Sequence, residues 1–371
     1  MKFDISSSEL LSGLVICSGS LSSNPVLPIL EDYKFDIRSN ELTIAATNLE
    51  TTIITKVDVI ADGEMTICIP AKVLLDTLKA LPQQPVSFDI NEDSLDIRIT
   101  SSYGKYKLTG NDPSDFPEIP VESEVNKFTA STQDIITAIN NTSFAVSNDE
   151  LRLAMTGVLM QLDYNKIIFV ATDAQKLVKH SFAGINSELS DSFIVPKKSL
   201  SLVKNVLQSD EEVVVAYNTK NVYFTSGETK VIARLIDAKY PDYNGVIPAS
   251  SPNVMEISRS SFQSSLRRIA IYANKTTNQV VLKIEENKMS ISAQDIDFAN
   301  EADEVLDCKY NGDPISISFS AKFLIEMLSI IGSDDVELLL DGPSRAGILV
   351  PKEQNEGQDL LMLVMPVMVA Y

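Results

Sequence analysis

Two hydrophobic patterns alternate along the chain and predict a protein of mixed helices and strands. Apolar side chains spaced three and four residues apart predict amphipathic helices, whereas short alternating or apolar runs predict strands. Strands are expected at 41–45, 86–90, 94–100, 105–108 and 166–170. Six helices are expected at Ser6–Ser20, Pro70–Leu81, Ser131–Val146, Pro196–Leu207, Ser258–Ala273 and Ser320–Ile331. Serine begins four of them, as expected of residues that cap a helix N-terminus.

The predicted elements recur three times along the 371 residues. The apolar motif around Lys72, which opens a helix, returns at Lys198 and more weakly at Lys322, at spacings of 126 and 124 residues. A second marker follows the same period and reads Ala46-Thr47-Asn48, then Ala171-Thr172-Asp173, then Ala293-Gln294-Asp295. Repetition at a fixed period indicates repeated structural domains, and each third of the chain is therefore expected to form one domain.

Proline-rich connectors separate these domains. Asn111–Pro120 and Tyr240–Pro248 each contain several prolines, which lack the amide donor that a strand needs. We place the boundaries near 122 and 251, which gives domains at 1–122, 123–251 and 252–371. The fold class is α+β, with three similar domains that each contain two helices and antiparallel sheets.

The charges are distributed unevenly over this plan. The chain has a formal net charge of −20, which taken alone argues against a nucleic-acid partner. The six predicted helices nevertheless carry nine basic and four acidic side chains. A cationic helical face on an acidic body holds a polyanion at one surface and repels it elsewhere. The helical cations expected to face DNA are Lys72, Lys79, Lys197, Lys198, Lys204, Arg267, Arg268 and Lys322.

Catalytic, metal and membrane signals are missing from the sequence. His180 is the only histidine, and Cys17, Cys68 and Cys308 have neither zinc nor redox spacing. The acidic run 89–96 lacks the glycine and glutamate of a calcium loop. We therefore expect no enzyme activity and no cofactor. No apolar stretch is long enough to span a membrane and no signal peptide is evident, so a cytoplasmic location is expected.

Four segments together resemble the bacterial DNA polymerase III beta subunit, the DNA sliding clamp. They are Pro25–Leu30 followed by Ala46–Glu50, Leu153–Leu159 followed by Ala171–Leu177, Tyr240–Tyr243 followed by Ile247-Pro248, and Val364–Met368. The resemblance covers the full chain through the order and spacing of these segments. It implies a homodimeric ring of six domains, with the helices lining the hole and the sheets outside. Such a ring encircles duplex DNA and tethers the replicative polymerase for processive synthesis, and Arg152 matches a further basic position beside the DNA.

The family resemblance also implies a hydrophobic pocket between the second and third domains. This pocket receives peptide motifs from the replicative polymerase, the clamp loader and repair proteins. The segment Ala174-Gln175-Lys176 stands where Gly-His-Arg is typical of the family, so the preferred peptide of this chain is expected to differ. The matching pocket residues are Met155, Thr172, Ala174, Gln175, Lys176, Leu177, Pro241, Val246, Ser320, Phe323, Val364, Met365, Pro366, Val367 and Met368.

The ring implied by the resemblance needs an interface between the first domain of one chain and the third domain of its partner. A basic edge would meet an acidic edge there. The residues expected on the first side are Lys105, Lys107 and Leu108, and those on the second are Ile271, Tyr272, Glu301, Asp303 and Glu304.

Two other functions are compatible with parts of the sequence. A three-domain scaffold would bind peptides without encircling DNA and would lack both the cationic helical face and the closed dimer. A metal-dependent nuclease built on the acidic clusters would cleave DNA only with divalent cations.

Overall fold

The computed structural model describes residues 1–22, 26–185, 189–207 and 212–367 and confirms the six predicted helices. All six are shorter at both ends than the hydrophobic pattern predicts. Their bounds are α1 Ser7–Ser18, α2 Ala71–Ala80, α3 Thr132–Thr142, α4 Lys197–Val206, α5 Arg259–Ile269 and α6 Ala321–Ile330.

The expected serine caps are mostly wrong. Ser6, Ser258 and Ser320 occupy N-cap positions, but their side chains accept no capping hydrogen bond. The Ser6 hydroxyl instead pairs with that of Ser8, at 2.9 Å, and Ser258 pairs likewise with Ser260, at 3.3 Å. Each of these three serines is also the last residue of a β-strand that runs directly into the helix. Ser131 ends a strand as well, and its hydroxyl does accept a hydrogen bond, from the Asp134 amide at 3.4 Å.

The chain divides into two compact units. Unit 1 contains Met1–Ile136 and Lys198–Leu235, and unit 2 contains Thr137–Lys197 and Ile236–Tyr371. The middle repeat, 123–251, is therefore shared between them, with its second helix and following strands in unit 1 and its first sheet in unit 2.

Unit 1 contains two antiparallel sheets. The first has the order β5-β1-β7-β8-β9 and the second β10-β15-β16-β17-β4-β3-β2-β6. The strands of the first are β1 Lys2–Ser6, β5 Ile60–Ala61, β7 Pro85–Ile90, β8 Asp96–Thr100 and β9 Lys105–Thr109. Those of the second are β2 Asp32–Arg38, β3 Glu41–Thr47, β4 Thr51–Asp58, β6 Met65–Pro70, β10 Asn126–Ser131, β15 Glu212–Tyr217, β16 Asn221–Ser226 and β17 Thr229–Arg234.

Unit 2 also contains two antiparallel sheets. Their orders are β14-β11-β12-β13-β26-β25-β24-β18-β22 and β21-β20-β19-β23. The strands of the first are β11 Gly157–Asp163, β12 Lys166–Thr172, β13 Lys176–Ala183, β14 Ser190–Pro196, β18 Asn253–Ser258, β22 Lys309–Tyr310, β24 Asp335–Leu340, β25 Gly347–Pro351 and β26 Gln358–Val364. Those of the second are β19 Gln279–Glu285, β20 Lys288–Asp295, β21 Asn300–Asp307 and β23 Ile315–Ser320.

The longer sheet in each unit joins two repeats. In unit 1, β17 of the middle repeat pairs antiparallel with β4 of the first repeat. In unit 2, β26 of the third repeat pairs antiparallel with β13 of the middle repeat. The same type of junction between repeats is thus built twice along the chain.

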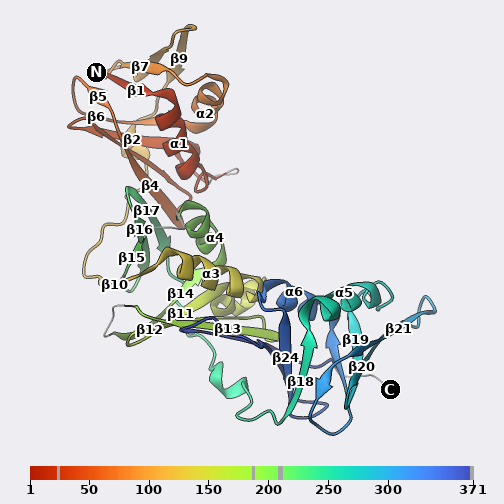
Figure 1. Ribbon diagram of the computed structural model, residues 1–371. Coiled ribbons are helices and arrows are strands. Elements are labelled where there is room, and N and C mark those ends of the chain that lie inside the picture. Colours follow the sequence, from red (N-terminus) through yellow and green to blue (C-terminus); the bar gives the residue numbers. More distant parts are fainter. Residues whose placement is uncertain (23–25, 186–188, 208–211, 368–371) are drawn as a thin grey trace. The chain divides into compact units, whose positions relative to one another are not determined.

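Helices pack in pairs against the sheets. In unit 1, α1 contacts α2 and lies against β3 and β4, with Leu10, Leu14 and Cys17 fully buried. In unit 2, α5 contacts α6 and lies against β20 and β21 (Figure 1). Burial of the apolar face leaves the polar face of each helix in contact with solvent, and most of the helical cations lie on that face.

Candidate nucleic-acid and peptide interfaces

The helical cations form the candidate nucleic-acid surface. Most of them are exposed, whereas Lys197 and Lys204 are half-buried. Six of them make no ion pair with any residue that the structure describes, namely Lys72, Lys79, Lys198, Lys204, Arg267 and Lys322. Unpaired cations on exposed helix faces can contact phosphates, and such contacts carry no base-sequence information.

Two of the predicted DNA-facing arginines are already engaged within the chain. Arg268 donates two hydrogen bonds to Glu304, at 2.7 and 2.6 Å, and these bonds hold the pKa of the Glu304 carboxyl below its usual value. Arg152 forms a 3.4 Å ion pair with Asp149. The Arg268 pair joins a residue expected to face DNA to one expected at the dimer interface, so a phosphate would have to compete with a bidentate carboxylate there.

The residues expected in the peptide pocket come from five separate segments of unit 2. They are the end of the 3₁₀-helix η4 (Glu150–Thr156), the turn before β13, the connector around Pro241, the start of α6 and the end of β26. Backbone hydrogen bonds hold the last segment in place. The amide of Met365 donates to Gln175 at 2.8 Å, and the amide of Val367 donates to Ser318 at 2.8 Å. Met368 lies outside the described residues.

An apolar cluster forms the base of this region. Leu177 and Leu363 are buried in it, and Tyr243 joins them from the connector between the middle and third repeats. Ala154 of η4 and Ile247 of the connector pack against the cluster. Val246 and Met365 remain exposed, the latter by 43%, so apolar side chains are left free beside a buried apolar base. This arrangement suits an apolar side chain of a partner.

Lys176 ties the two repeats together at this site. Its side chain is only 7% exposed, and its Nζ lies 2.8 Å from the Asp173 carboxylate and 3.6 Å from that of Glu326. The same Nζ lies 4.3 Å from the centre of the Phe323 ring. A buried cation with two carboxylates and an aromatic face is compensated. Lys176 therefore fixes α6 against the turn before β13 rather than presenting a free charge to a ligand.

The turn before β13 requires an unusual backbone conformation at Ala174. The Asp173 carboxylate accepts from the amides of Gln175 and Lys176, at 2.9 and 2.8 Å, and this leaves Ala174 with a φ of 73°. Left-handed geometry costs a residue with a Cβ about 1 kcal/mol, and glycine adopts it freely.

We expect Ala174→Gly to stabilise the protein by about 0.5–1 kcal/mol, because removing the strain outweighs the greater chain entropy of glycine. Calorimetry should show the melting transition of unit 2 rising by about 1–3 °C. The matched control is Ala80→Gly at the exposed end of α2, which should lower stability by about 0.5–1 kcal/mol. A fall in melting temperature for both variants would contradict the strain at Ala174.

The residues expected at the dimer interface lie at sheet edges. Lys105, Lys107 and Leu108 belong to β9, the end strand of the first sheet of unit 1. Glu301, Asp303 and Glu304 belong to β21, the end strand of the second sheet of unit 2. Ile271 and Tyr272 follow α5 and are exposed apolar side chains.

The described part of the chain shows neither a metal-binding group nor a reactive thiol. Within it, no three His, Cys, Asp or Glu side chains are grouped so that they could hold a metal ion. Its three cysteines are buried and unpaired, and burial raises the pKa of each thiol. His180 is buried, with its Nδ1 3.2 Å from the Asn141 side-chain amide. None of the helices in the described part of the chain is long and apolar enough to span a membrane.

Sequence reasoning missed two features of these surfaces. The burial of Lys176 depends on Glu326, which is 150 residues away in sequence, so no local pattern indicates the pair. The pairing of Arg268 with Glu304 was missed for the same reason. The repeat offered one signal for these features. Because α6 follows β23 in the third repeat as α4 follows β14 in the middle one, the repeat predicts that α6 and α4 occupy equivalent places.

The comparisons with known proteins cover nearly all of the chain. Models of the DNA polymerase III beta subunit match residues 1–120 as its N-terminal domain, 129–242 as its central domain and 244–367 as its C-terminal domain. A beta sliding clamp of Pseudomonas aeruginosa is 27% identical over 371 residues, which are 99% of each chain. A beta sliding clamp of Staphylococcus epidermidis is 26% identical over 372 residues and 98% of each chain.

Solved structures give the same picture. The DNA polymerase III beta subunit of Thermotoga maritima has a TM-score of 0.89 at 27% identity, over 100% of both chains. The beta subunit of Pseudomonas aeruginosa has a TM-score of 0.94 at 24% identity, again over 100% of both chains.

Proposed function

Because the chain belongs to the DNA polymerase III beta subunit family, we propose that two copies close into a ring that encircles duplex DNA and holds the replicative polymerase to it. The chain is a DNA sliding clamp, a processivity factor rather than an enzyme. We propose 1–122, 123–251 and 252–371 as its three domains and the cytoplasm as its location.

The two internal junctions support ring closure through the edge strands β9 and β21. The strand order β4-β3-β2-β6 of the first repeat recurs as β13-β12-β11-β14 and as β21-β20-β19-β23. Likewise β7-β8-β9 recurs as β15-β16-β17 and as β24-β25-β26. Since β17 pairs with β4 and β26 with β13, the equivalent third pair is β9 with β21. A homodimer makes this third pair twice and leaves neither edge open.

The internal registers extend to this third pair. At the two existing junctions, Lys230 is opposite Ile54 and Leu361 is opposite Lys179. The positions equivalent to these pairs in β9 and β21 are Lys105 and Asp303. The same register sets Lys107 opposite Glu301, so two cations would face two carboxylates across the interface. Opposite charges on facing strands stabilise an antiparallel pair.

DNA contacts in the ring are proposed for the helical cations and Arg152. Six of the helical cations have no described ion-pair partner, which leaves them available to phosphates. A closed ring retains DNA by topology, so weak and salt-screened contacts are sufficient and allow the duplex to slide.

The peptide pocket is proposed on the exposed Met365 and Val246 beside the buried cluster of unit 2. Its partners would be apolar-tipped motifs of the replicative polymerase, the clamp loader and repair proteins. Methionine adapts its shape to different ligands, which suits one surface that serves several partners.

Topological retention is the direct test of encirclement. After loading onto nicked circular DNA, the protein should stay bound through gel filtration and should be released within minutes once the circle is cut. Blocking both ends of the linear DNA with bulky proteins should restore retention. Equal retention on circular and unblocked linear DNA would exclude topological binding and favour a scaffold that does not encircle DNA.

A further inference from the structure

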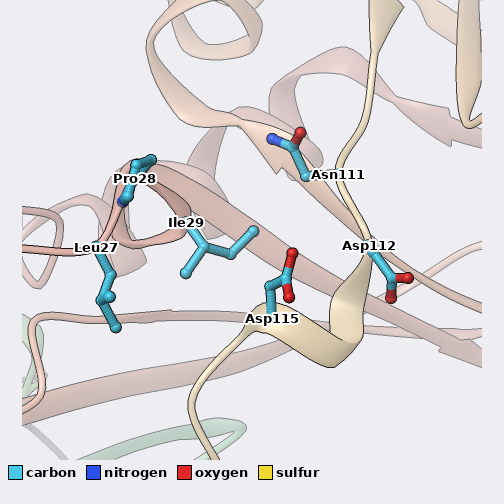
Figure 2. Close-up of a pocket in the computed structure, with 6 residues that line it drawn as sticks. All are labelled: Leu27, Pro28, Ile29, Asn111, Asp112 and Asp115. Carbon is cyan, nitrogen blue, oxygen red and sulfur yellow. The ribbon is translucent and has the colours of Figure 1, made fainter.

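Unit 1 contains a cavity of about 380 Å³ that none of the proposed contacts uses. Leu27, Pro28 and Ile29 form one wall, at the start of the 3₁₀-helix η1 (Pro28–Glu31). Asn111, Asp112 and Asp115 form the other, around the 3₁₀-helix η2 (Pro113–Asp115) (Figure 2). The cavity thus has one apolar wall and one wall with two carboxylates.

The cavity lies between the first-repeat counterparts of two of the segments expected in the peptide pocket, namely η4 and the connector that follows β17. η1 leads directly into β2 as η4 leads into β11. The chain that leaves β9 pairs with β6, where the amide of Asn111 donates to the Cys68 carbonyl at 2.8 Å. The chain that leaves β17 makes the equivalent contact, from Ile236 to Ile194 at 3.0 Å.

The side chains around the two sites correspond as well. In unit 1, Ile29, Leu30, Cys68 and Phe116 form a buried cluster, and Ile119 packs against it. In unit 2, the matching cluster includes Ile194 and Tyr243, with Ala154 and Ile247 packed against it. In both connectors the last of these isoleucines directly precedes a proline.

The contact between repeats is also built twice. In unit 2, Lys176 of β13 contacts Phe323 of α6. In unit 1, the equivalent residues are Thr51 of β4 and Ser199 of α4, whose hydroxyls lie 2.7 Å apart. Thr51 and Ser199 are not among the described residues that line the cavity, so the cavity corresponds to the part of the proposed peptide pocket that η4 and the connector form.

The chemistry of the connector wall differs between the two sites. Asp112 follows Asn111 as Asp237 follows Ile236, but the first connector then presents Asp115 where the middle one presents Tyr240. Neither aspartate pairs with a cation among the described residues. The amide of Ser114 donates to Asp112 at 2.8 Å and lowers the pKa of its carboxyl, so this group stays charged. The described residues that line the cavity include no lysine or arginine.

We propose that this cavity is a second docking site for partner proteins, which accepts an apolar side chain flanked by arginine or lysine. The apolar side chain would lie on Leu27 and Ile29, and the cation would pair with Asp112 and Asp115. Two carboxylates disfavour phosphate, so DNA is not the occupant. The inference rests on the proposed function, because the counterpart pocket in unit 2 is itself proposed to bind peptides.

The test is a methyl NMR titration of the intact protein with two blocked tetrapeptides. The first probe is acetyl-Leu-Arg-Leu-Phe-amide, and the second replaces arginine with norleucine, which keeps the apolar stem and removes the charge. The arginine peptide should shift the Leu27 and Ile29 methyl signals. The norleucine peptide should bind there about tenfold more weakly, as expected when a charged hydrogen bond is lost. The Met365 methyl reports the unit 2 pocket independently and should respond to both.

Variants of the carboxylate wall complete the test. Asp112→Asn with Asp115→Asn should weaken arginine-peptide binding at Ile29 about tenfold or more, without changing the Met365 titration. Asp93→Asn, in an exposed turn of unit 1, is the matched control and should change neither. Three outcomes would each overturn the second site. They are unmoved Leu27 and Ile29 signals at millimolar peptide, equal responses to the two peptides, and a shift that a short DNA duplex causes instead. An unmoved Met365 signal would instead count against the unit 2 pocket.

Discussion

Replacing both Lys105 and Lys107 with glutamate should convert the protein from a dimer to a monomer at micromolar concentration. The proposed register would set these glutamates opposite Asp303 and Glu301, so that four carboxylates face one another at each of the two interfaces. Juxtaposed like charges cost several kcal/mol, and each 1.4 kcal/mol is a factor of about ten, so the dimer should weaken at least a hundredfold. Sedimentation velocity and light scattering measure this directly.

Compensation makes the prediction specific. Adding Glu301→Lys and Asp303→Lys to the same chain restores opposite charges in the same register, and this fourfold variant should dimerise again. Lys166→Glu with Lys220→Glu changes the net charge equally at surface positions away from both edge strands and should stay dimeric. Lys107 also forms a 3.0 Å pair with Asp96, but an exposed pair contributes only about 0–1 kcal/mol, so the folded units should persist. A dimeric charge-reversed variant, or a monomeric compensated one, would show that β9 and β21 do not meet in this register.

Met365→Ala with Pro366→Ala should remove peptide binding from the unit 2 pocket while leaving the fold intact. Val364 is buried and paired with Lys176 and Gly347, but the next two side chains project beyond the sheet. The local backbone is held by the Met365 and Val367 amides, which both substitutions keep. Truncating a central apolar anchor costs about 2–4 kcal/mol, so affinity should fall about 30-fold to 1000-fold.

Fluorescence polarisation with a labelled peptide from the replicative polymerase measures the loss. Ile60→Ala removes an exposed apolar side chain from β5 in unit 1 and serves as the control, with unchanged affinity expected. Thermal unfolding should be the same within error for both variants. If the Met365 and Pro366 substitutions left affinity unchanged, the peptide would bind elsewhere on the chain.

Local patterns were sufficient to predict the helices and the family. The motif around Lys72, Lys198 and Lys322 located the second helix of each repeat, because proline or serine there ends a strand and an apolar face of helical period follows. The family match confirms the resemblance that was drawn from the order of the motifs. Among the expected serine caps, the Ser131 side chain accepts a hydrogen bond from the Asp134 amide at 3.4 Å, whereas those of Ser6, Ser258 and Ser320 accept none.

The pairing of strands between repeats could not be obtained from any single stretch of sequence. The apolar residues along β4 and β13 indicate strands, but they do not show that β17 or β26 provides the neighbouring strand. Lys176 illustrates the same limit, since a lysine that follows two exposed residues gives no sign of lying against Glu326 and Phe323. The cavity beside Asp112 and Asp115 escaped notice because its two walls, at 27–29 and 111–115, are far apart in sequence.

The division of the middle repeat between two units has a consequence for synthesis on the ribosome. β4 acquires its partner β17 only after a long further stretch of chain has emerged, and Thr55 and Thr229, which meet there, are 174 residues apart. β13 waits similarly for β26. Contacts so distant in sequence form slowly, and open strand edges invite association with other nascent polypeptides. In a fragment of residues 123–251 made alone, β13 and β17 would each have one open edge, because β26 and β4 would be missing. Such a fragment would be prone to aggregate, whereas the intact chain covers both edges.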